Sequence, residues 1–203
     1  MIQNKDAKTV GRKKAFDPIV ALDAAMETFW AKGFDGTSID DLTTAMGINR
    51  PSLYATYGCK KTLFDKALQR YGETLGGEPL RLMEETDDIH EGVRTFLATA
   101  LKMQTRDDGP KGCFSVACGH VQGEPNACLQ ERLAEAGKQT HARISARLRR
   151  AVDDGQLRKD FDCDARAAIL MDFMTAQAVR ARGGETRCDL ASVQEERAAL
   201  VLS

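Results

Sequence analysis

The sequence predicts an all-α protein, because every clear apolar periodicity along its 203 residues has helical spacing. No alternating apolar and polar run is convincing enough to predict a β-strand. Clusters of glycine and proline separate the periodic segments into about nine helices. One such cluster, Gly76-Gly77 with Pro79, divides a smaller region of residues 1–75 from a larger one of residues 76–203.

The first helix is predicted to begin at Pro18 and to end at Gly33. Asp17 is a favourable N-cap, proline fits the first helical position, and glycine is a common helix end. The apolar stripe between these ends has three-and-four spacing and consists of Ile19, Leu22, Ala25, Met26, Phe29 and Trp30.

Two short helices follow, joined by a turn at Gly47. Thr37 is expected to start the first of them, because Asp40 lies where a capping box needs its carboxylate. Asn49 is expected to cap the second, in which Pro51 is tolerated within the first turn. Two short helices with a glycine-containing turn between them are the pattern of a helix-turn-helix.

The rest of the chain repeats helical spacing at greater length. A fourth helix is predicted to begin near Cys59 or Lys60. Beyond the glycine break, a helix is predicted from Ile89 to the stop at Gly109-Pro110, followed by a short apolar segment at residues 112–121. The remaining predicted helices run from Pro125-Asn126 to about Gly155, over residues 164–182, and over residues 189–202.

Charge is distributed unevenly along the chain. Residues 1–72 hold 11 Lys or Arg against 8 Asp or Glu, whereas residues 73–203 hold 18 against 22. A basic excess confined to one end is typical of a region with an anionic partner, although a solvated surface is the alternative. The basic arm around Arg12-Lys13-Lys14 could contact phosphates, or it could be simple disorder.

Targeting and redox features point to the cytoplasm. No amino-terminal apolar run resembles a signal peptide, and no stretch approaches about 18 consecutive apolar residues. We therefore expect a cytoplasmic protein, in which widely spread cysteines are reduced thiols and form no disulfide framework. The six are Cys59, Cys113, Cys118, Cys128, Cys163 and Cys188.

The second short helix has one apolar edge and one small, polar face. On a helical wheel of about 100° per residue that starts at Arg50, Leu53 and Tyr57 fall near 300° and 340°. Between about 140° and 240° on the same wheel lie Ala55, Ser52 and Thr56. Small and hydroxyl-bearing side chains let a helix approach base edges in the major groove of DNA.

The residues around this helix resemble the N-terminal region of TetR-family transcriptional regulators. The resemblance covers roughly residues 15–65, and the motifs in register are Gly33-Phe34, Thr37, Ala45-Met46-Gly47-Ile48, Leu53-Tyr54, Tyr57 and Lys60. Thr56 stands where the family usually has an aromatic residue or histidine, and Gly58-Cys59 replaces a frequent Pro-Ser. These departures leave the operator sequence and the phosphate contacts open.

The resemblance implies contacts with a double-stranded DNA operator. Tyr54 and Lys60 resemble clamps on the phosphate backbone, whereas Arg50 and Ser52 are candidates for reading bases. The complete set of candidate contacts is Thr37, Arg50, Pro51, Ser52, Tyr54, Ala55, Thr56, Tyr57 and Lys60.

The resemblance also implies a homodimer through the last two helices and a small-molecule pocket in the larger region. The segment 164–182 is apolar over more than one face, which fits a dimer surface or, alternatively, a central core helix. Effector binding in the pocket would release the DNA. The candidate pocket residues, each of which could equally be plain core, are Phe96, Leu97, Met103, Cys113, Phe114, Cys118, His120, Met171 and Phe173.

Cys113 has a possible sensing role. It follows Lys111 and Gly112 at an expected helix start, and both features would lower the pKa of its thiol. "Lys-Gly-Cys-Phe" resembles the P-x-G-C segment of a subset of TetR regulators, some of which respond to electrophiles or oxidants. A thiol sensor and an inert buried cysteine both remain open. Metal sensing by Cys113, Cys118 and His120 is disfavoured, because on one helix the two cysteines lie about 140° apart.

Enzyme motifs are missing from the sequence. Three scattered histidines accompany no nucleophile elbow, phosphate-binding glycine loop or HExxH motif. We therefore predict no catalytic residue, metal or cofactor, with a small helical enzyme or a helical interaction protein as the alternatives. The sequence favours a ligand-responsive transcriptional regulator, by resemblance a repressor, that binds a palindromic operator as a homodimer.

Overall fold

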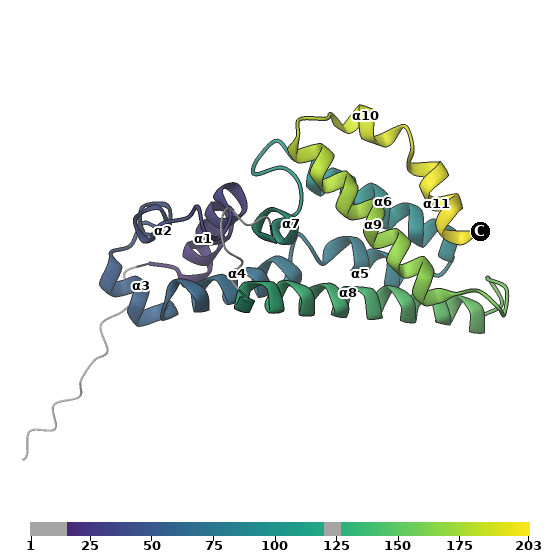
Figure 1. The fold of residues 1–203 in the computed structure, drawn as a ribbon, viewed down its shortest axis with the longest axis horizontal. Helices are drawn as coiled ribbons and strands as arrows, with labels where there is room; N and C mark the ends of the chain where they lie inside the picture. The colour runs from purple at the N-terminus through teal and green to yellow at the C-terminus, as the bar shows by residue number, and fades with distance from the viewer. Residues whose placement is uncertain (1–15, 120–126) are drawn as a thin grey trace, which may run out of the picture.

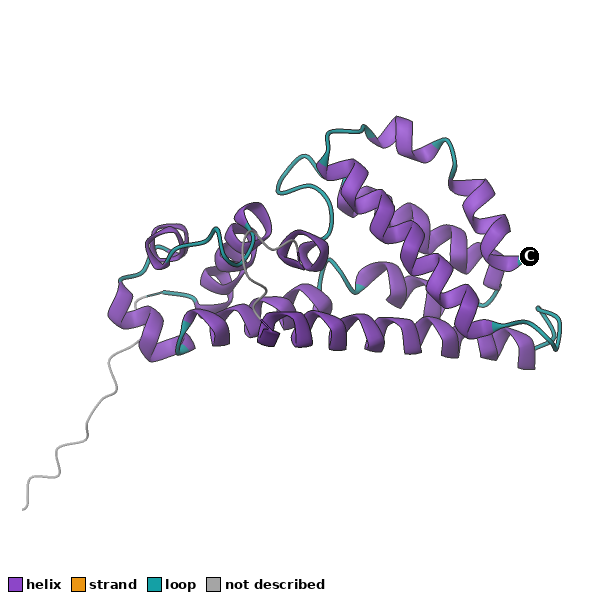
Figure 2. Cartoon of the chain, in the orientation of Figure 1, coloured by secondary structure: helices purple, strands orange, loops and turns teal. Residues whose placement is uncertain are grey.

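The structure is a computed structural model that describes residues 16–119 and 127–203. Within these ranges the chain forms helices and loops without a strand (Figure 2). The helices are α1 (Pro18–Lys32), α2 (Ile39–Met46), α3 (Arg50–Tyr57), α4 (Lys60–Glu73), α5 (Glu78–Glu85), α6 (Ile89–Gln104), α7 (Phe114–Gly119), α8 (Ala127–Asp153), α9 (Cys163–Arg182), α10 (Arg187–Ala191) and α11 (Gln194–Leu202). The all-α prediction is confirmed, and nine of the described helices have at least eight residues.

The molecule is elongated, and its helices form two groups along the long axis (Figure 1). Helices α1 to α4 form one group, and α5, α6, α9, α10 and α11 form the other. Helix α8 runs along one side of the larger group, while α7 packs against α1, α4, α8 and α9. The six-residue helix α7 therefore lies at the junction of the two regions.

The start of α2 differs from the prediction by one residue. Ser38 is the N-cap: its hydroxyl accepts the Asp41 N–H at 3.0 Å, and its own N–H donates to Asp41 Oδ2 at 2.9 Å. Thr37 is buried instead, and its hydroxyl donates to the Gly33 carbonyl at 2.6 Å. The sequence offers a capping pair in both registers, which is why spacing alone chose the wrong one.

The predicted break at Gly76-Gly77 and Pro79 is confirmed, because α4 ends at Glu73. Pro79, however, lies in the first turn of α5, a short helix that was not predicted from the sequence; proline fits there because the first-turn N–H groups have no helical partner. The single helix expected at 189–202 is divided between α10 and α11 by Ser192 and Val193. Among residues 16–119 and 127–203, no helix is long and apolar enough to cross a membrane.

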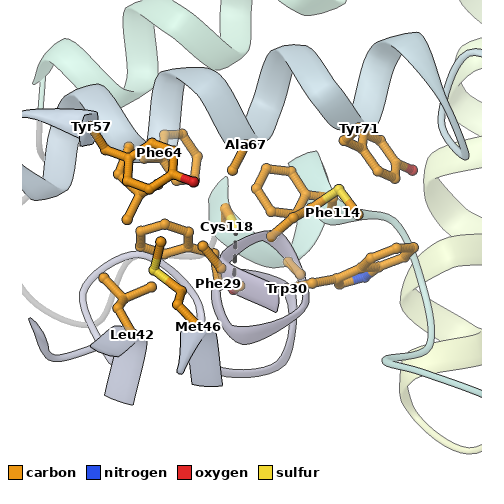
Figure 3. Close-up of a cluster of buried hydrophobic side chains, with 14 of the residues drawn as sticks. Phe29, Trp30, Leu42, Met46, Tyr57, Phe64, Ala67, Tyr71, Phe114 and Cys118 are labelled. Atoms are coloured by element: carbon orange, nitrogen blue, oxygen red, sulfur yellow. Dashed lines mark hydrogen bonds between the residues drawn. The ribbon is translucent and has the colours of Figure 1, made fainter. Parts of the chain in front are cut away.

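The apolar interior forms two main clusters. One joins α5, α6, α8, α9 and α11 around residues such as Phe96 and Leu148. The other joins α1 to α4 but also includes α7, whose Phe114 is fully buried. The Phe114 ring stacks on Phe64 at 5.5 Å and on Tyr71 at 5.3 Å between centroids (Figure 3). The two regions therefore share a core.

Candidate nucleic-acid interface

Helix α3 has one buried edge and one open face. Leu53 is 0% exposed and Tyr57 is 5% exposed, and both belong to the core that α7 completes. The Tyr57 hydroxyl donates to the Pro18 carbonyl at 2.7 Å, which fixes α3 against the start of α1. Residues that are wholly or partly exposed on α3 are Arg50, Pro51, Ser52, Tyr54, Ala55 and Thr56. The predicted division between buried edge and open face is confirmed.

The orientation of α3 is set by its cap and by the turn before it. The Asn49 side chain accepts the Ser52 N–H at 2.9 Å, as predicted for the N-cap. Gly47 takes a left-handed conformation, with φ of 64°, at the end of α2. The turn therefore redirects the chain within a few residues, and the small polar face begins at the first turn of α3.

Arg50 crosses from α3 to α2. Its guanidinium donates through Nε and NH2 to the Asp40 carboxylate, with distances of 3.0 and 2.7 Å to Oδ1. Both side chains are exposed, so solvent screens the pair and it adds little to stability. In this structure the Arg50 guanidinium is therefore held against α2 by an exposed ion pair.

Lys60 opens α4 next to the end of α3. Its ammonium lies 4.4 Å from the centroid of the Phe34 ring, a distance that permits a cation–π interaction. Partial burial lowers the pKa of Lys60. Lys61 differs, because a hydrogen bond with the Cys128 side chain raises its pKa and directs it toward α8. The two neighbouring lysines therefore have different surroundings, Lys60 over the Phe34 ring and Lys61 beside Cys128.

Two of the nine expected DNA contacts are support residues. Thr37 is 1% exposed with its hydroxyl bonded to Gly33, and Tyr57 is buried with its hydroxyl bonded to Pro18. Neither side chain reaches the open face of α3. Both side chains pack inside this structure, and a motif match alone cannot distinguish packing from DNA contact.

Comparisons with known proteins agree with this geometry. The model of "Bacterial regulatory proteins, tetR family" matches residues 21–67, and that of "Tetracyclin repressor-like, C-terminal domain" matches residues 90–193. The uncharacterized HTH-type transcriptional regulator YezE of Bacillus subtilis (strain 168) is 31% identical over 162 residues, 79% of this chain and 84% of YezE. The chain belongs to the TetR family.

Other relatives include DNA-bound members. The HTH-type transcriptional repressor ComR of Escherichia coli (strain K12) is 36% identical over 110 residues, 54% of this chain and 52% of ComR. Cysteine-substituted variants of the TetR-family regulator CifR, solved with 26-bp double-strand operator DNA, match with a TM-score of 0.88 and 30% identity. That match covers 93% of this chain and 98% of CifR.

The expected effector residues of this TetR-family chain do not share one cluster. Met103, Cys113, Phe114 and Cys118 belong to the core that contains α7, together with α1 to α4. The others that the structure describes pack in the second cluster, namely Phe96, Leu97, Met171 and Phe173. His120 lies outside the described residues. The candidate residues are therefore divided between two apolar clusters, and their role as an effector pocket stays a prediction.

Two surface grooves are lined by other residues. One, of about 320 Å3, lies where α8 leads into α9 and includes Arg149 and Phe161. The other, of about 530 Å3, lies between α6 and α11 and includes His90, Arg94 and Leu202. Neither contains an expected effector residue.

The two cysteines near α7 differ in environment. Cys113 is buried just before α7 and accepts a hydrogen bond from the Tyr71 hydroxyl at 3.4 Å. Cys118 donates to the Phe29 carbonyl at 3.4 Å (Figure 3), and burial, followed by the proximity of Cys113, raises the pKa of its thiol to about 12. Cys118 is therefore held as an unreactive thiol. No group of three His, Cys, Asp or Glu side chains suited to a metal occurs in the part of the chain that the structure describes.

Two arginines that the sequence did not single out connect the regions. Arg106, two residues after the end of α6, pairs with Glu27 at 2.9 Å, and its guanidinium lies 5.4 Å from the Trp30 ring centroid. Arg182, in the last turn of α9, donates to the carbonyls of Trp30 at 3.0 Å and Ala31 at 2.8 Å. Basic residues near helix ends are common, so nothing in the sequence marks these two as links.

Proposed function

We propose that this chain is a transcriptional repressor that binds a two-fold-symmetric operator as a homodimer and releases it when an effector binds. The observation that carries the proposal is the division of α3, with Leu53 and Tyr57 buried and the small polar face open. A helix of this kind fits the major groove, because short side chains let its axis come close to the base edges. A DNA partner places this function in the cytoplasm.

We assign base contacts to the centre of the open face and phosphate contacts to its margins. Ser52 and Thr56 can donate or accept hydrogen bonds, and Ala55 can meet the methyl group of thymine. Tyr54 is 49% exposed at the margin of this face, and we assign it to a phosphate that flanks the groove. Lys60 lies at a helix start, where free N–H groups also attract phosphate. Arg50 can serve either purpose once it leaves Asp40.

The dimer surface is proposed on α9 and α11. These two helices each expose a large apolar side chain, Val179 at 47% and Leu200 at 55%. TetR-family proteins act as dimers, and a pair of α3 helices doubles the number of base pairs read. Residues 1–75 would then be the DNA-binding domain and residues 76–203 the effector and dimer domain.

The test is selection of DNA by the wild-type protein from a random duplex pool. The expected product is an inverted repeat whose complex weakens as salt rises, because phosphate contacts release counterions. Ser52→Ala should change the selected bases, whereas Ser192→Ala, an exposed serine far along the chain between α10 and α11, should leave them unchanged. A selection that yields no enriched sequence would refute the proposal.

A thiol-reactive effector is the second candidate, favoured by the contact between Tyr71 and Cys113. Burial raises the pKa of Tyr71 well above its usual value, so its hydroxyl stays protonated and can donate to the Cys113 sulfur. The Cys113 sulfur would add to one carbon of an alkene electrophile, forming a C–S bond, and the thiol proton would end on the other alkene carbon. The adduct would then force α7 away from α4, because this core has no room for it.

N-ethylmaleimide tests this candidate. It should release operator from the wild type but not from Cys113→Ser. Cys59→Ser is the necessary control, because Cys59 is exposed near α3 and hydrogen bonds, chiefly from the Thr62 N–H, lower the pKa of its thiol. Release that persists in Cys113→Ser and vanishes in Cys59→Ser would assign the effect to the DNA-facing cysteine and exclude Cys113.

A further inference from the structure

Helix α1 is held at both ends by other parts of the chain. At its carboxyl end, Arg182 of α9 donates to the carbonyls of Trp30 and Ala31. These carbonyls belong to the last turn, where helical carbonyls lack N–H partners and the helix dipole favours a cation. At its amino end, the Pro18 carbonyl accepts the hydroxyl of Tyr57, the last residue of α3. Helix α1 therefore connects α9 to the DNA-facing helix.

The hydrogen bonds of Arg182 constrain the orientation of α9 relative to α1 as well as holding the two helices together. Its hydrogen-bond partners within the described residues are backbone carbonyls, the third being that of Lys111 at 3.4 Å. A planar guanidinium that bonds two successive carbonyls fixes an angle between the helices, which a single flexible ammonium cannot do. Beside it, a Cβ added to Gly112 would meet the Ala178 carbonyl of α9 at 2.8 Å, so the backbones are already in close contact here.

We infer that Arg182 is a positioning residue that sets the spacing of the two DNA-reading helices in the dimer. This inference rests on the proposed function, because it assumes that α9 lies in the dimer surface and that α3 reads DNA. In that arrangement, Arg182 transmits the orientation of the dimer helix α9 to α1. Helix α1, about 22 Å of rigid helix, passes it to α3 through the Tyr57 hydrogen bond.

The experiment uses the operator that the wild-type protein selects, with one or two base pairs inserted or deleted between the half-sites. One added base pair rotates a half-site by about 35° and moves it by about 3.4 Å, so a dimer with a fixed spacing loses affinity sharply. The profile is the affinity for each operator plotted against its half-site spacing. Arg182→Ala is expected to reduce the ratio between the affinities for the natural and the altered spacing by about tenfold, the equivalent of one hydrogen bond to a charged group. Arg182→Lys should restore part of it.

The matched control is Arg180→Ala. This substitution removes the same charge two residues earlier in α9, but Arg180 bonds to Glu185 of the following loop and not to α1. It should keep the wild-type profile. Tyr57→Phe, which removes the hydrogen bond at the other end of α1, should flatten the profile as Arg182→Ala does. If circular dichroism shows that Arg182→Ala is unfolded, Tyr57→Phe replaces it as the test variant.

The outcomes distinguish the role of Arg182 from the proposed function on which it depends, operator binding. A wild type that selects no DNA would overturn the proposed function itself. If the wild type selects an operator but a folded Arg182→Ala keeps the wild-type profile, or loses affinity equally at every spacing, Arg182 does not set the spacing. The inference would also be wrong if Arg180→Ala flattened the profile to the same extent.

Discussion

Replacement of Lys60 by alanine is expected to reduce the salt dependence of operator binding. Lys60 opens α4 directly after α3, and its ammonium lies over the Phe34 ring. If this ammonium meets a DNA phosphate, the contact releases a condensed counterion. Its loss should therefore weaken the complex most at low salt, where counterion release contributes most.

The magnitude follows from the symmetry of the dimer. Each phosphate contact contributes about 0.9 to the slope of log affinity against log salt, and two copies of Lys60 contribute about 1.8. Between about 50 and 200 mM salt, the wild type should lose roughly 12-fold more affinity than Lys60→Ala. The selected bases should be unchanged, because phosphates carry no sequence information directly.

Fluorescence anisotropy of a labelled operator at four or five salt concentrations measures both slopes. Lys61→Ala is the matched control, since its side chain bonds to Cys128 of α8 and not to the open face. Its slope should equal that of the wild type. Equal slopes for Lys60→Ala and the wild type would refute the phosphate contact, and a slope change in Lys61→Ala alone would reverse the assignment.

Three further predictions concern the local structures that hold α2, α3 and the junction. An ion pair with Lys32 holds the pKa of Asp41 well below its usual value, so the ionised carboxylate stabilises the fold above about pH 4 and loses this effect as the pH falls below that. The difference in unfolding free energy between wild type and Asp41→Asn, measured in urea, should therefore become smaller as the pH is lowered. Asn49→Ala should lower the unfolding free energy by about 0.5–2 kcal/mol, measured in urea, because it removes the α3 cap; an unchanged urea midpoint would show that the cap contributes nothing. Gly112→Ala should destabilise the chain more than Gly155→Ala: both glycines have positive φ, but only the first has a carbonyl in the path of a Cβ. Equal urea midpoints for the two would contradict the close contact.

Much of the smaller region could be predicted because its determinants are local. Asp17, Asn49 and Gly47 each form their capping hydrogen bonds with residues no more than four positions away. The helical wheel that placed Leu53 on the buried edge of α3 needs only the helical period. The errors also have a local cause. Adjacent serine and threonine with adjacent aspartates allow two capping registers, and only the burial of Thr37, with its hydroxyl on the Gly33 carbonyl, selects one.

The site was harder to predict where residues far apart in sequence meet. Tyr57 matches a family motif at a DNA-facing helix, yet its role depends on Pro18, which lies 39 positions earlier. Arg182 and Trp30 are separated by 152 positions, and no periodicity relates them. Cys113 was singled out for its neighbours in sequence, whereas the structure gives it a partner, Tyr71, from another helix. Sequence patterns therefore placed side chains on faces but could not say what each face would meet.

The shared core makes a final prediction about residues 1–75 expressed alone. In the whole chain Phe114 is fully buried against Phe64 and Tyr71, and its ring also meets Trp30 edge-on at 6.4 Å. Removing the larger region exposes these rings, and the loss of a buried phenylalanine with its aromatic pairs amounts to at least about 3 kcal/mol.

Trp30 is the sole tryptophan of the chain, so its fluorescence reports unfolding at the junction. The midpoint of the urea transition should be lower for the fragment than for the full chain. Equal midpoints would mean that α7 packs on the smaller region without stabilising it. The route from Arg182 through α1 would then be the stronger of the two links between the regions.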